Sequence, residues 1–216
     1  NPGRFTHPAV SNYMGATFLK QALIELAPDA SVLQMPATDE TFDATVAPLW
    51  AWYDELRPTL WRGGETFPEN DSVLQQMLND GEVDISMAFD PASAAAAIEQ
   101  GLLPETVRTY ALDGGSIGNI SFVAIPFNAA NAEGAQVVAN FLLDPSTQAH
   151  AQDITIMGSF SVLDPAKLSD ADKALFAALP SSPALPSNEE LGATLLEPHA
   201  SWMTRLTEAW AERYTK

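Results

Sequence analysis

Histidine, cysteine and serine motifs, which would carry acid–base, metal or nucleophilic chemistry, are sparse in this chain. The three histidines, His7, His150 and His199, are far apart, and none stands at the HExxH spacing of a helical zinc site. The absence of cysteine removes disulfides, thiolate catalysis and cysteine-ligated zinc. A GxSxG nucleophile motif is also absent. The sequence therefore predicts no catalytic residue, no metal site and no cofactor.

Two short motifs resemble ligand-binding loops but are incomplete. Residues 115–118 read Gly-Ser-Ile-Gly, which lacks the full GxGxxG or GxxxxGK pattern of nucleotide-binding loops. Asp80, Glu82 and Asp84 alternate as in a calcium loop, but the spaced glutamate that should follow the central glycine is missing. We interpret the first motif as a turn before a strand and the second as a helix-to-strand turn.

Aromatic residues gather in one stretch of the chain. Trp50, Trp52, Tyr53, Trp61 and Phe67 fall within eighteen residues. On a helix, Trp50 and Tyr53 share a face and should belong to the core, whereas Trp52 points elsewhere and Trp61 lies in a glycine-rich loop. Such rings either pack together or line a pocket for a ring or a cation. The sequence leaves both interpretations open.

The charge balance is strongly acidic. There are 28 Asp and Glu residues against 10 Lys and Arg, a formal net charge of −18. Nucleic acids require a basic footprint on the protein, so they are excluded as partners, and anionic membrane surfaces are disfavoured for the same reason. The acidity either attracts cationic solutes or serves solubility in a salt-tolerant host.

The bulk composition is that of a globular protein. Hydrophobic residues make up 46% and charged residues 18% of 216 residues, enough for one large domain or two small ones. No apolar run approaches the roughly 20 residues that span a bilayer. The first eight residues do not resemble a secretory signal. The chain is therefore expected to be cytosolic, already processed, or cropped from a longer protein.

Apolar periodicity and capping residues predict strands that alternate with helices. The helices are expected at 15–27, 38–57, 71–80, 91–100, 132–142, 146–151, 170–179 and 199–214. The strands are expected at 4–10, 32–35, 83–89, 107–112, 119–125 and 159–163. This order predicts an α/β fold with a mainly parallel sheet flanked by helices.

Three strand-to-helix junctions are the candidate ligand-binding points. In parallel sheets, ligands bind beyond the carboxyl ends of strands, often where a helix begins. The junctions lie at 11–16, 89–91 and 116–119. We expect them to lie along a common groove.

Several segments together resemble one known family. They are the opening NPGRFTHP, the stretch YMGATFL at 13–19, the strand NDGEVD at 79–84, the pair Ile125-Pro126 and the helix ANFLLDPSTQ at 139–148. This pattern is similar to the solute-binding proteins of bacterial ABC importers, and within them to the iron, thiamine and polyamine group. The resemblance implies a type II periplasmic-binding fold, in which two lobes close on a solute and the closed form docks on the permease.

The resemblance implies a binding site rather than an active site. Tyr13 would stack on or hydrogen-bond the solute, and the backbone amides of Gly15 and Ala16 would hold an anionic group. Asp90 would either pair with a cationic group or cap its helix. The complete expected set is Tyr13, Met14, Gly15, Ala16, Trp61, Phe89, Asp90 and Asn119.

The nature of the solute follows from residue types. The iron-binding members of this group use adjacent tyrosines, and the sequence has no Tyr-Tyr pair, which disfavours ferric iron. The acidic balance and the aromatic residues favour an organic cation such as thiamine or a polyamine.

Family members are longer, with a signal peptide and a first lobe that would precede Asn1. The resemblance therefore implies a second-lobe α/β segment at 1–118, a crossing strand and helices at 119–163, and a helical segment at 164–216 that returns to the second lobe. The middle segment would normally pack on the first lobe, so its apolar face is expected to be exposed or covered by another copy of the chain. The implied location is periplasmic or otherwise extracytoplasmic, and the implied partners are the permease subunits in the inner membrane.

Two alternatives remain open. One is a small α/β enzyme, of hydrolase or transferase type, acting in the same kind of cleft. The other is a protein-interaction domain with the terminal helix, 202–214, as its contact surface.

Overall fold

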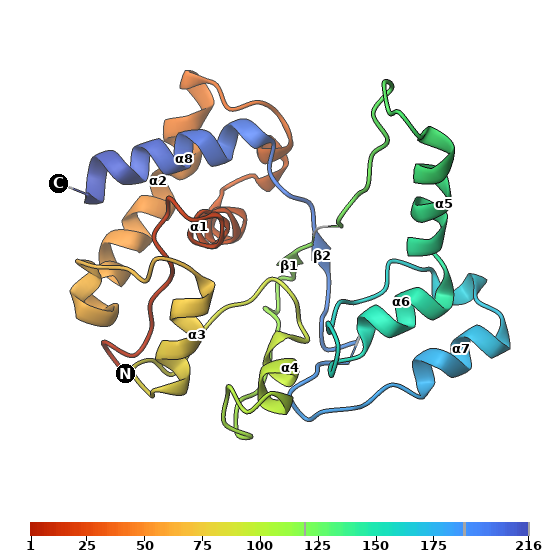
Figure 1. The fold of residues 1–216 in the computed structure, drawn as a ribbon. Helices are drawn as coiled ribbons and strands as arrows, with labels where there is room; N and C mark the ends of the chain where they lie inside the picture. Colours follow the sequence, from red (N-terminus) through yellow and green to blue (C-terminus); the bar gives the residue numbers. More distant parts are fainter. Residues whose placement is uncertain (119, 188, 216) are drawn as a thin grey trace. The chain divides into compact units, whose positions relative to one another are not determined.

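The chain forms two compact units in a computed structural model that describes residues 1–118, 120–187 and 189–215 (Figure 1). Unit 1 comprises Asn1–Phe89, Ala111–Gly118 and Gly192–Lys216. Unit 2 comprises Asp90–Tyr110 and Asn119–Leu191. These boundaries do not test the division into three segments that was expected from the sequence, and that division remains a prediction.

Unit 1 is mainly helical. Its helices are α1 (Tyr13–Leu26), α2 (Asp39–Leu56), α3 (Asp71–Asn79) and α8 (Ala200–Tyr214), with short 3₁₀ turns at Ala30–Gln34, Arg57–Thr59 and Trp61–Gly64. Thr38 and Asn70 cap α2 and α3, because their side chains accept hydrogen bonds from the amides of Thr41 and Val73. α2 contains Pro48 and continues through it as one helix, in agreement with the single helix expected at 38–57.

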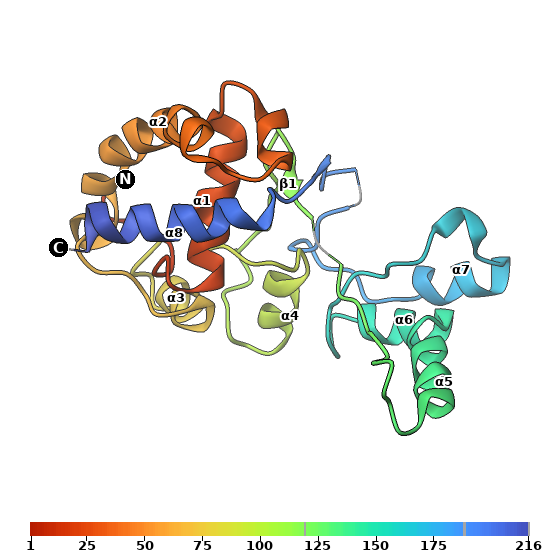
Figure 2. The same cartoon turned by 90° about the horizontal axis from the view of Figure 1, so that it is seen from above.

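The core of unit 1 lies where α8 packs on α1 and α2, as Figures 1 and 2 both show. Trp50 and Tyr53 are buried, as their shared helical face predicts. One side of α8 is apolar and faces this core, because its Trp202 and Leu206 are fully buried. The buried residues of this core are Val10, Leu19, Ala22, Leu23, Leu33, Phe42, Val46, Leu49, Trp50, Tyr53, Trp202, Leu206 and Trp210.

Strands are few among the described residues. β1 (Ser116–Ile117) and β2 (Thr194–Leu195) pair in parallel, with Ser116 opposite Thr194 and Ile117 opposite Leu195. Phe5 and Ile85 form one further parallel bridge. The fold is thus mixed α/β, as predicted, with a parallel sheet much smaller than expected.

Most of the predicted strands are wrong. Residues 32–35 lie mainly in a 3₁₀ turn, and the runs 4–10 and 83–89 share only the single Phe5–Ile85 bridge. The runs 107–112, 120–125 and 159–163 form no strand, and Asn119 lies outside the described residues. A β-prone run becomes a strand only when a neighbouring strand takes up its backbone hydrogen bonds, and few of these runs lie beside one another.

Unit 2 consists of short helices around a small core. They are α4 (Ser93–Glu99), α5 (Ala132–Leu142), α6 (Pro145–Gln152) and α7 (Asp170–Ala177), with a 3₁₀ turn at Pro165–Lys167. Asn131, Asp144 and Ser169 cap the last three helices, as their positions predict. The buried core cluster holds Ala92, Ala95, Ile154 and Ala184.

A helix must be both long and predominantly apolar to span a bilayer. The described helices do not meet these two requirements together, so not one of them is long and apolar enough to cross a membrane.

Candidate functional site

Two residues from separate predicted junctions meet at the start of α1. The rings of Tyr13 and Phe89 lie with their centroids 5.5 Å apart. Both remain accessible, with exposed fractions of 45% for Tyr13 and 58% for Phe89. Asn12 fixes the start of the helix by accepting a hydrogen bond from the Met14 amide at 2.9 Å. The result is an exposed aromatic pair on a rigid helix start.

A carboxylate lies beside this aromatic pair. The Tyr13 hydroxyl donates a hydrogen bond to Glu197 Oε1 at 3.2 Å, and Lys20 Nζ donates to the same oxygen. The hydrogen bond from Lys20 is the main cause that lowers the pKa of Glu197. Glu197 is therefore ionised at neutral pH, and among the described residues its Oε2 has no hydrogen-bond partner.

Lys20 itself is hidden from solvent. Its side chain is 1% exposed, against 34% for that of Glu197. Its Nζ lies 4.9 Å from the centroid of the Tyr13 ring, a cation–π distance. The Lys20 ammonium group thus neutralises part of the Glu197 charge and contacts the Tyr13 ring on its buried side. The groups of this site that solvent can reach are the two aromatic rings and a carboxylate oxygen.

The third junction is tied to the same helix through Gln21. Its Nε2 donates to the Gly115 carbonyl at 3.1 Å, and its Oε1 accepts from the Ile117 amide at 2.9 Å. β1 therefore lies against α1, and its partner β2 ends two residues before Glu197. We name the group formed by Tyr13, Phe89, Lys20 and Glu197 the aromatic–carboxylate cluster.

Sequence reasoning found the two aromatic members of this cluster and missed the two charged ones. Lys20 stands on an ordinary amphipathic helix, and Glu197 follows a linker rich in proline and serine. The two residues are separated by 177 positions in the chain. No local pattern signals a pair of that kind.

Met14, Gly15 and Ala16 hold the helix start in place. All three are buried. A Cβ atom on Gly15 would lie 2.3 Å from the Pro8 carbonyl oxygen and 2.4 Å from that of Ala9, so only glycine fits there. The Ala16 amide donates to the Asn12 carbonyl at 3.0 Å and is engaged inside the helix.

The other expected site residues lie apart from the cluster. Trp61 packs in unit 1 against a separate set of buried residues, Leu74, Met77 and Val83, with the Arg62 guanidinium 4.1 Å above its ring. Asp90 belongs to unit 2. Asn119 lies outside the described residues.

Asp90 lies in the turn before α4 and is not its N-cap, because that position is Ala92 and no side chain caps this helix. Asp90 Oδ1 accepts a hydrogen bond from the Ala92 amide at 3.0 Å, in the turn that leads into α4. Burial raises the pKa of its carboxyl, and the bond from Ala92 opposes that shift.

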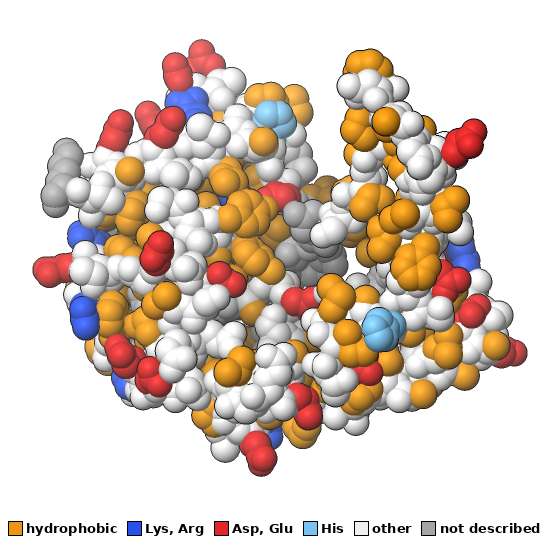
Figure 3. All heavy atoms as spheres, in the orientation of Figure 1, with side chains coloured by type: hydrophobic (Ala, Val, Ile, Leu, Met, Phe, Trp, Pro, Cys, Tyr) orange, Lys and Arg blue, Asp and Glu red, His pale blue; other side chains and the backbone are white. Residues whose placement is uncertain are grey.

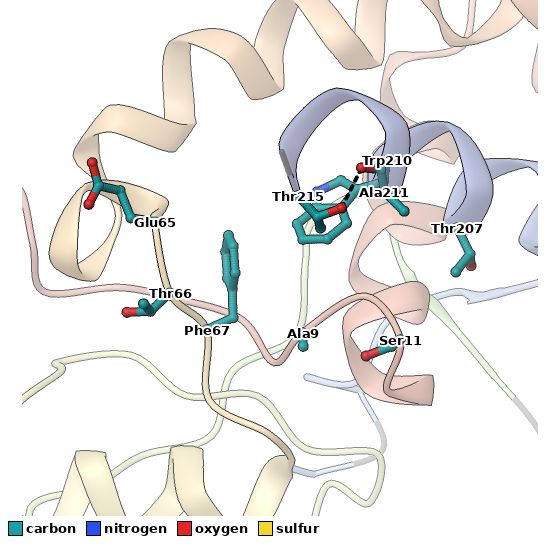
Figure 4. A pocket seen from close by; sticks show the side chains of 9 residues that line it. All are labelled: Ala9, Ser11, Glu65, Thr66, Phe67, Thr207, Trp210, Ala211 and Thr215. Atoms are coloured by element: carbon teal, nitrogen blue, oxygen red, sulfur yellow. Dashed lines mark hydrogen bonds between the residues drawn. The ribbon is translucent and has the colours of Figure 1, made fainter.

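A pocket of about 400 Å³ lies elsewhere in unit 1 (Figure 4). Phe67 and Trp210 form its aromatic side, edge to face with centroids 5.3 Å apart. Its remaining lining residues are Ala9, Ser11, Glu65, Thr66, Thr207, Ala211 and Thr215. The Thr215 hydroxyl donates to the Ala211 carbonyl at 2.6 Å. No member of the aromatic–carboxylate cluster is among the residues that line this pocket.

His7 packs against Phe67, and its ring has a structural role. Its ring stacks on Phe18 and on Phe67, each at a centroid distance of 4.7 Å. Its Nδ1 lies 2.7 Å from the Pro8 carbonyl, to which it donates, and its Nε2 accepts from the Tyr53 hydroxyl at 2.8 Å. Burial lowers the pKa of His7 to about 4, so the ring is neutral at pH 7.

Within the described part of the chain, no three His, Asp or Glu residues lie close enough together to hold a metal ion.

Among known proteins, the chain is similar to "Protein YnjB" of Escherichia coli (strain K12). The two are 40% identical over 215 residues, which cover 99% of this chain and 53% of YnjB. The chain thus spans about half the length of the curated relative that it matches. No family model matches the chain, and no solved structure matches it.

Proposed function

We propose that this chain is the solute-capturing part of an extracytoplasmic binding protein that serves a bacterial ABC importer. The observation that carries the proposal is the aromatic–carboxylate cluster, in which Tyr13, Phe89 and Glu197 meet from three distant points of the sequence. The resemblance of residues 79–149 to that family supports it. In the proposed protein, unit 1 belongs to one lobe of a type II periplasmic-binding fold that closes on the solute with a second lobe.

The accessible groups of the cluster favour an organic cation as the solute. Exposed ring faces attract a cationic group, and an ionised carboxylate oxygen accepts its N–H donors. The one ammonium of the cluster, on Lys20, is buried and cannot repel a solute by direct contact. The net charge of −18 raises the local concentration of cations further. A quaternary or protonated amine with a ring, of the thiamine or polyamine kind, fits these groups.

The proposal is binding without chemical change. Glu197 is held ionised by Lys20 and Tyr13, so it acts as a fixed counter-charge and not as a proton donor. Tyr13 offers a ring face and a hydroxyl that is already bonded to Glu197. These groups orient and hold a solute, and the closed protein then docks on the permease.

A thermal-shift screen tests the solute class. The protein is best assayed within a chimera in which this chain replaces the matching region of YnjB, because the chain spans only about half of that relative. One organic cation should raise the melting temperature, whereas neutral sugars and simple metal ions should not. Glu197→Gln should remove most of the shift, since it deletes the counter-charge.

The matched control for that variant is Glu189→Gln, which changes an exposed glutamate of unit 2. It should leave the shift unchanged. Stabilisation by sugars alone, or an equal shift in the Glu197→Gln variant, would contradict the proposed solute class. Conversion of the solute into a product would contradict binding without chemical change.

A further inference from the structure

The pocket beside Phe67 and Trp210 has the dimensions of a second ligand site in unit 1. Its volume of about 400 Å³ lies within the range of about 300–1,000 Å³ that small-molecule sites occupy. Figure 4 shows that its walls come from the loop before α1, from the segment 65–67 and from the C-terminal part of α8. All of its described lining residues belong to unit 1, so this unit supplies the pocket by itself.

The aromatic side of the pocket is held in place from behind. The Phe67 ring stacks on His7 at a centroid distance of 4.7 Å. Trp210 is 5% exposed, and its ring lies edge to face with Tyr53 at a centroid distance of 6.5 Å and tilted against Tyr214 at 5.9 Å. Because these rings are fixed before a ligand arrives, binding against them costs little conformational entropy.

The two hydroxyls at the α8 side of the pocket are left as hydrogen-bond acceptors. Thr207 donates its hydroxyl hydrogen to the Met203 carbonyl at 2.8 Å, and Thr215 donates its own to the Ala211 carbonyl at 2.6 Å. A hydroxyl that has used its one hydrogen offers only its oxygen to a ligand. The indole N–H of Trp210 is buried and is not accessible as a donor. These groups therefore favour a ligand that donates hydrogen bonds.

The charge of the pocket favours a cation. Among the described lining residues the charged one is Glu65, whose exposed carboxylate forms no hydrogen bond or ion pair with another described residue. None of the described lining residues is Lys, Arg or His, so the lining offers an anionic ligand no positive side chain. The hydroxyls of Ser11 and Thr66 can donate or accept and so fit either kind of ligand. A free carboxylate near aromatic rings is an arrangement that binds an ammonium group.

We propose that this pocket binds a small primary amine, in addition to any solute that the aromatic–carboxylate cluster holds. The ammonium group would donate to the acceptors of the lining, with Glu65 as its counter-charge. A ring or a short alkyl chain would lie against Phe67 and Trp210. Neither the solute class nor the transport function proposed above enters this inference, because no member of the cluster lines the pocket.

Glu65 and Glu197 differ in a way that lets experiment separate the two sites. Glu197 is already bonded to Lys20 and Tyr13, whereas Glu65 has no such partner among the described residues. Neutralising Glu65 therefore removes the counter-charge of the pocket without breaking an ion pair of the fold. Its effect on the free energy of unfolding should stay within about 0.5 kcal/mol, as for other exposed positions.

Titration of the chain, followed by nuclear magnetic resonance, tests the proposal with phenethylammonium as the probe. Amide shifts should change at 9–11, 65–67 and 207–211, with a dissociation constant on the order of 1 mM, as expected for a ligand of this size. Two molecules of the same shape control for charge. Neutral phenethyl alcohol should bind at least about fivefold more weakly, and anionic hydrocinnamate should not bind.

Weak attraction to the overall charge must be separated from binding in the pocket. The net charge is −18, and Figure 3 shows Asp and Glu side chains scattered over the face that it draws. Glu65→Gln should weaken the binding of phenethylammonium by about tenfold and leave that of phenethyl alcohol unchanged. Glu69→Gln removes an exposed carboxylate just after the segment 65–67 but not from the pocket lining, and it should change the binding by less than about twofold.

Any one of four results would overturn the proposal. Equal weakening by the two substitutions would mean that the amine responds only to overall charge. Shifts confined to 13–20 and 195–199 would make the aromatic–carboxylate cluster the binding site of the amine. Hydrocinnamate that binds as tightly as phenethylammonium would contradict the charge argument, and a lack of any amine binding would leave the pocket without its proposed ligand.

Discussion

The His7 ring is stacked between two aromatic rings, and both of its nitrogens are hydrogen-bonded. Because the folded chain holds this ring in its neutral form, protonation of His7 should lower the free energy of unfolding. Burial lowers its pKa from 6.5 to about 4 in the folded chain. In the unfolded chain, His7 binds a proton near pH 6.5. The contribution of His7 to the free energy of unfolding is therefore fully present above that pH and is lost as the pH falls toward 4. We predict a loss of about 1 kcal/mol between pH 7.5 and pH 5.5, measured by urea unfolding.

The control for this prediction is His7→Phe, which keeps an aromatic ring between Phe18 and Phe67. It should flatten the dependence between pH 7.5 and 5.5, whatever it does to absolute stability. The carboxylates with lowered pKa, such as Glu197, lose their contribution only at more acidic pH. An unchanged slope in the variant would show that another group titrates in this window.

Gly15 offers a second prediction at a single position. Because a Cβ atom there would overlap the Pro8 and Ala9 carbonyl oxygens, Gly15→Ala must displace the start of α1 or the loop before it. We expect a loss of about 2 kcal/mol in the free energy of unfolding, measured with urea. Alanine normally favours a helix over glycine, so an increase in stability would mean that the close approach is relaxed in solution.

Some residues of the candidate site could be predicted from neighbouring sequence, and others could not. Tyr13 and Phe89 could be predicted because each stands where a junction was expected, which is a matter of nearby sequence. Lys20 and Glu197 could not, because the burial of Lys20 depends on a partner 177 residues away. Trp61 was expected in the binding site because of its residue type. Its position in a separate packed cluster depends on tertiary contacts, which cannot be predicted from the residue type.

At the scale of elements, helix starts were predictable and strands were not. A cap is a contact between residues two or three positions apart, so the start of a helix can be predicted from nearby sequence. The capping residues Thr38, Asn70, Asn131 and Ser169 are examples. A strand needs a partner from elsewhere in the chain, and runs such as 107–112 lack one among the described residues.

The cap of α2 gives a quantitative test at this scale. Thr38 and Thr41 form a reciprocal capping box, with the Thr41 hydroxyl 3.1 Å from the Thr38 amide. Thr38→Ala should reduce the free energy of unfolding by about 1 kcal/mol, measured with urea. Thr106→Ala, at an exposed position outside any helix, should change it by less than about 0.5 kcal/mol. Equal effects of the two substitutions would rule out the capping contribution.

At the scale of the whole molecule, the acidic charge should oppose folding. A net charge of −18 produces self-repulsion that salt screens within a Debye length of about 10 Å at 0.1 M. The melting temperature should therefore rise by about 3 °C or more when sodium chloride is increased from about 20 to about 300 mM, because the Debye length shortens over this range. Neutralising three exposed acidic residues, by Glu55→Gln, Glu208→Gln and Glu212→Gln together, should reduce that rise. A melting temperature that falls with salt would mean that ion pairs such as Arg205–Asp39 outweigh the repulsion.

The mixed α/β class could be predicted from the order of patterns along the sequence, whereas an expected division of the chain came only from the family resemblance and not from local patterns. Each unit is assembled from segments that are not contiguous, since Ala111–Gly118 and Gly192–Lys216 return to unit 1. Pairing of β1 with β2 and packing of α8 on α1 accompany that return. Such long-range contacts leave little mark on local sequence.

The most direct test of the account is calorimetric titration of the chimera with the organic cation that stabilises it most. We predict binding of one solute per chain, recovery of the solute unchanged, and an affinity about tenfold lower in Tyr13→Ala, from the loss of roughly 1–2 kcal/mol of ring contact. Tyr110→Ala, which removes another exposed tyrosine, should leave the affinity unchanged. Equal binding by Tyr13→Ala and the unchanged protein, or no binding of any organic cation, would contradict the account.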